Sequence, residues 1–289
     1  MFLILGFLQG MTAGFTVVTA QHYGAGNQKA MRRSVASAAV LSAVVSVVLT
    51  AVSMAMMEQI LHWMNTPEDM YGQAYGYIMV ICAGIVAQVL YNLLASILRA
   101  IGDSKRPLYF LILAAFLNVV LDLLFIAGFH MGAEGAAYAT VISQGVSGGL
   151  CLFYIYKKVP ALHLHREDWR LDGDLVKWQV AIGFPMAFQY SITAIGTIVL
   201  QACLNTLGSV AAAGFAAASK IEQVVSQAYV ALGTTMATYC AQNTGAGEKE
   251  RLRKGFRSAT WIGIIYAVLS GLLIILAGKY LTVLFVSET

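Results

Sequence analysis

The sequence predicts an all-α integral membrane protein, a polytopic helical bundle with two pseudo-symmetric lobes. The first observation behind this prediction is composition: of 289 residues, 59% are hydrophobic and 11% are charged, against about 25% charged residues in an ordinary soluble domain. The other two are a series of apolar segments of membrane-spanning length and a stretch that occurs twice. The net charge of +4 is small and spread over several loops, so no nucleic-acid partner is predicted.

The apolar segments set the expected number of transmembrane helices. The mean hydropathy of the chain is +0.73. A bilayer core about 30 Å thick requires about 20 apolar residues in a helix. Eight segments qualify: residues 2–20, 34–57, 75–98, 107–129, 134–156, 179–204, 210–240 and 258–278. We therefore expect eight passes through the lipid bilayer.

Lysine and arginine residues lie in alternate connections between these segments. All of the 18 except Lys220 and Lys279 fall in the connections after the first, third, fifth and seventh segments. Because cytoplasmic loops carry an excess of basic residues, these basic connections are predicted to be cytoplasmic. The expected location is the inner (cytoplasmic) membrane.

A short basic stretch occurs twice in the chain. Residues 20–33 (AQHYGAGNQKAMRR) return 221 positions later as residues 241–254 (AQNTGAGEKERLRK), each between two apolar segments. Internal repeats of this length in membrane proteins are typical of transporters. We interpret each copy as a hairpin between two helices, with a packing role for its glutamine. The matching residues of the two hairpins are Gln21 and Gln242, Gly24 and Gly245, and Gly26 and Gly247.

The longest polar stretch, residues 157–177, lies between the two copies. It is interpreted as a connection between lobes. The predicted organisation is an N-lobe over residues 1–160, an inter-lobe linker over residues 161–178, and a partial C-lobe over residues 179–289.

Ionisable groups within a span carry a free-energy penalty of about 2.5–3.5 kcal/mol on insertion scales, so each is a candidate functional group. Asp122 lies within the fourth segment, and Asn118 precedes it by one turn on the same helix face. A carboxyl group beside an amide at low dielectric is suited to taking up and releasing a proton, and the same oxygens could bind sodium. The alternative is that Asp122 only hydrogen-bonds a neighbouring helix near the membrane surface.

Further polar residues lie in the sixth and seventh segments. Gln189, Tyr190 and Thr193 are candidates to line a cavity near Pro185, although hydrogen bonding between helices would explain them equally. Glu222 is a candidate substrate contact or an interfacial charge, and Lys220 does not share its helix face.

Enzymatic chemistry has no candidates in this sequence. The residues of a catalytic triad do not share a plausible cavity, and the four cysteines lie in apolar runs without CxxC pairing. No catalytic residue, metal site or cofactor is therefore predicted. Ion coupling would use H⁺ or Na⁺.

Several motifs resemble the MATE (multidrug and toxin extrusion) family of transporters, in particular its DinF-like bacterial branch. These are RAIGDSKRPLYF at 99–110, NVVLDLLFI at 118–126, GAEGAAYATVISQ at 132–144, GFPMAFQ at 183–189 and the paired QxxGAG hairpins. The resemblance implies a monomeric antiporter of twelve helices and two lobes. Such proteins export organic, often cationic, compounds in exchange for Na⁺ or H⁺ by alternating access.

In that family's order the eight segments correspond to helices 2 to 9, so the chain is expected to be a fragment. The resemblance places Asn118 and Asp122 in the N-lobe helix that carries cation-coupling groups. Some branches have an acidic residue in helix 7 about where this chain has Thr193, so a sodium site of that type is not expected.

Two alternative functions are retained. A flippase for lipid-linked saccharides would need several basic residues in its spans, and only Lys220 is present there. A non-transporting membrane scaffold would not require Asp122 within the bilayer.

Overall fold

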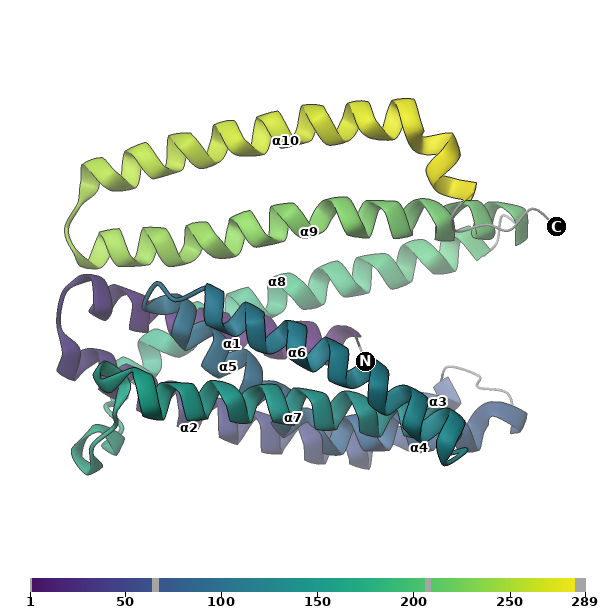
Figure 1. The fold of residues 1–289 in the computed structure, drawn as a ribbon, viewed down its shortest axis with the longest axis horizontal. Helices are drawn as coiled ribbons and strands as arrows, with labels where there is room; N and C mark the ends of the chain where they lie inside the picture. Colours follow the sequence, from purple (N-terminus) through teal and green to yellow (C-terminus); the bar gives the residue numbers. More distant parts are fainter. Residues whose placement is uncertain (1, 64–67, 206–208, 284–289) are drawn as a thin grey trace. The chain divides into compact units, whose positions relative to one another are not determined.

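The computed structural model describes residues 2–63, 68–205 and 209–283. These residues form helices and the turns that join them, with no strand among them, as Figure 1 shows. The prediction of an all-α fold is therefore confirmed. The elements are α1 (Phe2–Gly24), α2 (Gln28–Ala55), α3 (Met57–Trp63), α4 (Glu68–Ala83), α5 (Ile85–Ala100), α6 (Lys105–Asp122), η1 (Leu123–Gly128), α7 (Gly132–Lys158), η2 (Pro160–Leu162), η3 (Arg166–Trp169), α8 (Gly173–Asn205), α9 (Ser209–Gly245) and α10 (Lys249–Val283).

Every predicted transmembrane segment coincides with one helix or with two consecutive helices. By length and composition, four helical stretches among the described residues could each cross a membrane: α2, α6 with η1, α7 and α10. The pair α4 and α5 makes a fifth if it forms one broken span. Three further predicted segments correspond to the long helices α1, α8 and α9.

The third segment, expected as one helix, is two. Its parts α4 and α5 are bent by 43° at Gly84. The side chain of Val141, from α7, packs so close to Gly84 that a Cβ atom there would overlap it. The break therefore occurs where a neighbouring helix occupies the space of a side chain.

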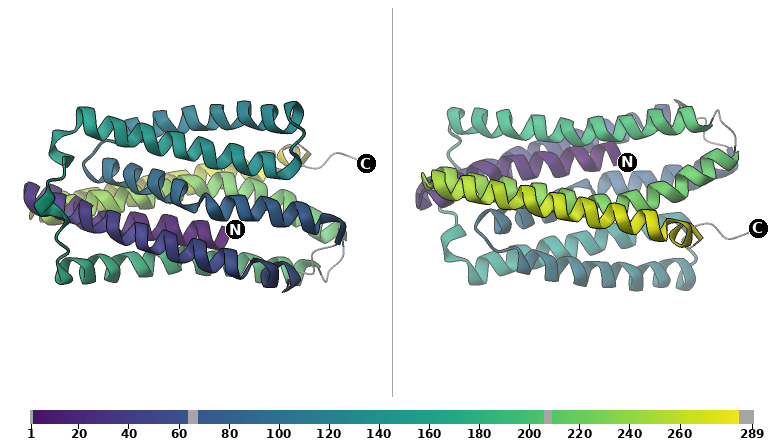
Figure 2. Two further views of the ribbon diagram at one scale, coloured as in Figure 1. Left: turned by 90° about the horizontal axis from the view of Figure 1, so that it is seen from below. Right: turned by 90° about the horizontal axis from the view of Figure 1, so that it is seen from above.

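The chain divides into two compact units, Met1–Ser191 and Ile192–Thr289, and the boundary falls within α8. In the first unit α5 is central, because α1, α2, α6 and α7 all pack against it; Figure 2 shows these helices from two sides. Its side chains fill the core: Val89, Leu93, Ile97 and Leu98 are all buried.

Within the first unit, α1 packs closely against the beginning of α8. Gly6, Gly10 and Gly14 form a stripe on α1, and a Cβ atom on Gly14 would lie 2.5 Å from the Cα atom of Gly183. Small residues at intervals of four let helix backbones approach in membranes, where packing rather than hydrophobicity holds helices together. Phe7 adds edge-on contacts with Phe184 and Phe188 of α8.

The second unit contains the end of α8 together with α9 and α10, and the last two form a hairpin. Tyr266 of α10 donates a hydrogen bond to the carbonyl of Val225 (2.9 Å). Its ring meets that of Tyr229 edge-on, with centroids 5.1 Å apart. Near the turn, Tyr239 donates to the carbonyl of Arg251 (2.9 Å). These contacts join α9 to α10 along their length.

Candidate functional site

The pair Asn118 and Asp122 lies at the carboxyl end of α6, in the first unit. Both side chains are half-buried, in a helix that packs along α7. The Nδ2 atom of Asn118 and the Oδ1 atom of Asp122 are fully buried and have no hydrogen-bond partner among the described residues. An unsatisfied buried polar group costs about 1–3 kcal/mol. The carboxylate oxygen of Asp122 is therefore suited to receive a proton or a cation, whereas the amide nitrogen of Asn118 is a hydrogen-bond donor that lacks an acceptor.

The backbone changes directly after this pair. Residues Leu123–Gly128 form a π-helix, whose turn is wider than that of an α-helix. Short π-helical turns inside α-helices are rare and are frequent at functional sites. The π-helix is therefore a second reason, besides the polar side chains, to consider the end of α6 a candidate functional site. The sequence contains no signal for it.

The candidate cavity residues of α8 differ in their surroundings. Tyr190 packs against α1, since a Cβ atom on Gly10 would lie 2.8 Å from its ring. Gln189 and Thr193 are exposed, and the carbonyl of Thr193 accepts a hydrogen bond from the Thr197 hydroxyl (3.0 Å). Gln189 and Tyr190 belong to the first unit, and Thr193 belongs to the second. Neither of the two cavities described below is lined by these residues.

Glu222 lies on α9, in the second unit, and is exposed. Its carboxylate accepts a hydrogen bond from the hydroxyl of Ser226, one turn further along the same helix (2.5 Å). Lys220 is exposed as well. The local partner of Glu222 is thus a serine on its own helix.

The first repeated hairpin closes α1 with a Schellman motif. The amide of Gly26 donates to the carbonyl of Tyr23 (3.0 Å), and the amide of Asn27 donates to the carbonyl of His22 (3.1 Å). Gly26 has φ +69°, a conformation that glycine adopts without strain. The side chain of Asn27 then caps α2 by accepting from the amide of Ala30 (3.0 Å).

The second hairpin repeats these bonds 221 positions later. The amide of Gly247 donates to the carbonyl of Thr244 (3.1 Å), and the amide of Glu248 donates to the carbonyl of Asn243 (2.9 Å). Gly247 has φ +73°. The duplication detected in the sequence is therefore also a duplication of backbone structure.

The remaining matched residues end the helices before the two turns. Gly24 and Gly245 are the last residues of α1 and α9. The carbonyl of Gln21 accepts from the amide of Ala25, and that of Gln242 accepts from Ala246, both at 2.9 Å. In the backbone, both glutamines therefore contribute to closing the last helical turn.

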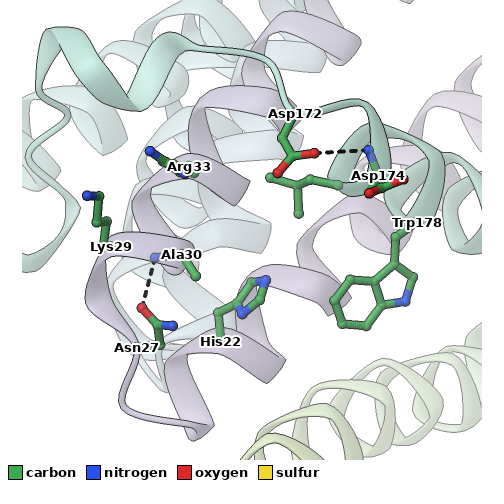
Figure 3. Close-up of a pocket in the computed structure, with 9 residues that line it drawn as sticks. His22, Asn27, Lys29, Ala30, Arg33, Asp172, Asp174 and Trp178 are labelled. Atoms are coloured by element: carbon green, nitrogen blue, oxygen red, sulfur yellow. Dashed lines mark hydrogen bonds between the residues drawn. The ribbon is translucent and has the colours of Figure 1, made fainter.

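A surface cavity of about 360 Å³ lies between the first hairpin and the start of α8, and Figure 3 shows its lining. Lys29 and Arg33 lie on the hairpin side, and Asp172 and Asp174 lie on the other. Burial lowers the pKa of His22, whose ring meets that of Trp178 edge-on. The sequence indicated a basic hairpin but not this opposing acidic pair. Their proximity depends on how the linker folds back.

An ion pair fixes that linker to α2. Arg32 Nε lies 3.1 Å from Oδ2 of Asp168, whose side chain is 3% exposed. The amide of His165 donates to the same oxygen (2.9 Å). Burial by itself raises the pKa of Asp168, but the bonds from His165 and Arg32 outweigh it, so the pKa lies below its usual value. These partners are 136 positions apart, and the sequence gives no local signal for the contact.

Metal-ligating side chains do not gather into a cluster of three or more within residues 2–63, 68–205 and 209–283. Cys82 and Cys151 are buried, whereas Cys203 is exposed, and within the described residues none of the four cysteines forms a disulfide.

Comparison with known proteins relates nearly the whole chain to membrane transporters. The model of the MatE family matches residues 1–124 and 185–289. The "Probable multidrug resistance protein YpnP" of Bacillus subtilis is 32% identical over 287 residues, which cover 99% of this chain and 64% of that protein. The "FAD transporter" of Shewanella oneidensis is 26% identical, over 85% of this chain and 55% of that protein. The chain thus spans less than two thirds of the length of these relatives.

A solved structure shares the fold. The "Outward-facing conformation of a multidrug resistance MATE family transporter of the MOP superfamily" aligns with a TM-score of 0.90 at 22% sequence identity. The alignment covers 99% of this chain and 64% of that one.

Proposed function

Because this chain belongs to the MatE family, as its motifs predicted, we propose that it is the greater part of an ion-coupled exporter of organic compounds. It is a multi-pass helical membrane protein of a transporter family, not an enzyme. The proposed substrates are small organic molecules, in particular cationic drugs or toxins. The proposed driving ion is H⁺ or Na⁺.

The observation that carries the ion-coupling proposal is the pair Asn118 and Asp122. Each has a buried polar atom without a partner in the described structure, and the π-helix begins at the next residue. A bound proton or sodium ion would satisfy the carboxylate oxygen, and removing it would restore the unsatisfied state. Such an ion shifts a conformational equilibrium when it binds one arrangement of the protein more tightly than the other.

Two units and a duplicated hairpin support transport by alternating access. Repeated halves that rock about a central site are the usual architecture of secondary transporters. We assign residues 1–160 to the N-lobe, 161–178 to the linker and 179–289 to part of the C-lobe. Binding at Asp122 would favour one arrangement of the lobes.

The proposed orientation places the basic connections in the cytoplasm and the protein in the inner membrane. Lys157→Cys, in a variant without the native thiols, should be protected from an impermeant thiol reagent in intact cells. Labelling of that cysteine from outside would contradict the proposed orientation and indicate the opposite one.

Drug efflux from an exporter-deficient strain tests the function. The strain would express this chain together with any coding sequence that flanks it in its genome, and ethidium efflux would be followed with and without sodium. Sodium-dependent efflux assigns Na⁺ as the coupling ion, whereas efflux that follows the pH gradient alone assigns H⁺. Absence of ethidium export under both conditions would contradict the cationic-drug proposal.

Asp122→Asn should abolish ion-driven efflux because the amide can neither release a proton nor bind a cation by charge. Asp122→Glu keeps the carboxyl group and should retain part of the activity. Glu58→Gln, an exposed carboxylate on α3, is the matched control and should export normally. Unchanged efflux in Asp122→Asn would remove the coupling role of this residue.

A second candidate is the export of an anionic dinucleotide, favoured by the similarity to the FAD transporter of Shewanella oneidensis. Efflux of FAD into the medium, measured by its fluorescence in the same strain, distinguishes this candidate from drug export.

A further inference from the structure

A second cavity, of about 650 Å³, lies within the first unit, away from Asn118 and Asp122. Its walls are α2, α5 and α7, and the linker closes one end through Leu162 and Leu164. The wall formed by α2 leaves space because small residues, including Ala39 and Ala43, recur on it at helical spacing. Its volume lies within the range of about 300–1,000 Å³ that is typical of sites for small ligands.

The cavity opens towards the lipid. Val47 of α2, Val86 of α5 and Leu152 of α7 all line it, and their side chains are 61%, 51% and 52% exposed. In membrane-spanning helices, aliphatic side chains that no other described residue covers are suited to contact hydrocarbon. A molecule in this cavity can therefore enter sideways from the bilayer, and its buried part must be apolar.

The length of the cavity matches one leaflet. On α2 its lining runs from Val35 to Val47, which at 1.5 Å per residue is about 18 Å. Half of the hydrocarbon core is about 15 Å. Val35 lies three residues after Arg32, and Tyr156, which lines the cavity on α7, directly precedes Lys157. The cavity therefore begins at the basic side of the membrane and ends near the bilayer midplane.

The end of the cavity on the basic side is polar and cationic. His165 and Trp169 line it there, and each is followed by an exposed arginine, Arg166 and Arg170. The nearby carboxylates offset this charge only in part, because Asp168 is buried in its ion pair and the exposed Glu167 stands against four exposed basic residues, Lys157, Lys158, Arg166 and Arg170. Tryptophan prefers the interface between hydrocarbon and head groups. Basic residues at this level attract anionic lipids.

We propose that this cavity binds one acyl chain of an anionic glycerophospholipid from the leaflet on the basic side, with the phosphate held beside Arg166 and Arg170. The apolar walls, the length of one leaflet and the positive rim each match a different part of that molecule. Assigning the leaflet to the cytoplasm rests on the proposed orientation. The binding itself does not depend on transport.

Photolabelling in nanodiscs tests the proposal with the 289-residue chain. The probe is phosphatidylglycerol with a diazirine on one acyl chain, in a phosphatidylcholine background, and labelled peptides are mapped by mass spectrometry. We expect labels on the α2 and α5 residues of the cavity. The same diazirine on phosphatidylcholine should label them much less, and equal labelling by both probes would overturn the proposal.

Val47→Trp should abolish labelling in the cavity by filling its mouth. Val44→Trp is the matched control, because Val44 is 55% exposed on the same helix and does not line the cavity. Equal labelling in the two variants would mean that the probe reports only the general lipid surface and would overturn the site. Both positions are exposed, so neither variant disturbs the core.

The charge of the rim has its own test. Arg166→Gln should weaken phosphatidylglycerol labelling about fivefold, since one basic residue near the surface contributes about a factor of five. Arg253→Gln, in the second basic hairpin, should leave it unchanged. Equal effects of the two substitutions would contradict a local head-group site.

A disulfide-linked dimer formed through Val47→Cys, and absent from the unsubstituted chain, would assign this face to a second copy and overturn the proposal.

Discussion

We expect the Arg32–Asp168 ion pair to hold the linker on α2. Asp168 is 3% exposed, and its Oδ2 atom accepts from Arg32 (3.1 Å) and from the amide of His165 (2.9 Å). Asp168→Asn keeps an acceptor oxygen for the amide but removes the charge that faces Arg32. A hydrogen bond to a charged group contributes about 1.5–3 kcal/mol. We take about 2 kcal/mol for this loss, because Arg32 is only 20% exposed and is little screened.

A loss of about 2 kcal/mol raises the population of detached linker about thirtyfold. Trypsin cleaves after Arg166 and Arg170, which lie on this linker. When opening and closing are fast relative to cleavage, the rate of proteolysis follows that population. Purified chain in nanodiscs should therefore be cut in the linker about thirtyfold faster in Asp168→Asn than in the unsubstituted protein.

Glu167→Gln is the control, because Glu167 is the exposed neighbour of Asp168 and its substitution makes the same chemical change. It should leave the rate of cleavage unchanged. Adding Arg32→Gln to Asp168→Asn should have little further effect, since the partner is already lost. Equal cleavage rates in Asp168→Asn and Glu167→Gln would refute the conclusion that the ion pair holds the linker.

The remaining predictions concern low pH and two glycines. Because the pKa of Asp168 is lowered in the fold, the stability that its ion pair gives to the linker contact is complete above the ordinary aspartate pKa of about 3.9. This stability is lost as the pH falls through the lowered pKa. Pepsin should therefore cut the linker faster as the pH falls through that range, and a constant rate would contradict this. Gly14→Ala places a Cβ atom 2.5 Å from Gly183 and should destabilise the fold by about 1–3 kcal/mol, measured as a lower melting temperature. Gly26→Ala should lower the free energy of unfolding by about 1–2 kcal/mol, because Gly26 has a positive φ that alanine adopts only with strain. Gly149→Ala, on α7 with open space around it, is the control for both glycines, and an equal loss there would contradict both reasons.

The positions of the long helices could be predicted because hydrophobicity is a local property. Runs of about 20 apolar residues mark them, and the repeated motif fixes the ends of α1 and α9 at Gly24 and Gly245. The bend at Gly84 could not be predicted in this way. Its segment is apolar on both sides, and the side chain that packs at the break, Val141, belongs to another helix.

The candidate site was predictable only in part for the same reason. Asp122 stands out in the sequence because a carboxylate within an apolar segment is unusual. The π-helix after it has no signal in the residues Leu123–Gly128, which are ordinary apolar residues and one glycine. The Arg32–Asp168 pair joins positions that only the fold of the linker brings together, and the cavity behind Val47 likewise depends on how three helices pack.

The two hairpins show which part of the duplicated sequence determines structure. The residue after the turn is Asn27 in one copy, where its side chain caps α2, and Glu248 in the other, yet the amides of both make the same bond to the helix before. Both copies keep a glycine at positive φ, Gly26 or Gly247, and a basic stretch after it. The glycine sets the path of the chain, and in the proposed orientation the basic residues keep the turn on the cytoplasmic side. Because these two requirements are independent of the capping residue, the two copies can diverge at that position and still form the same turn.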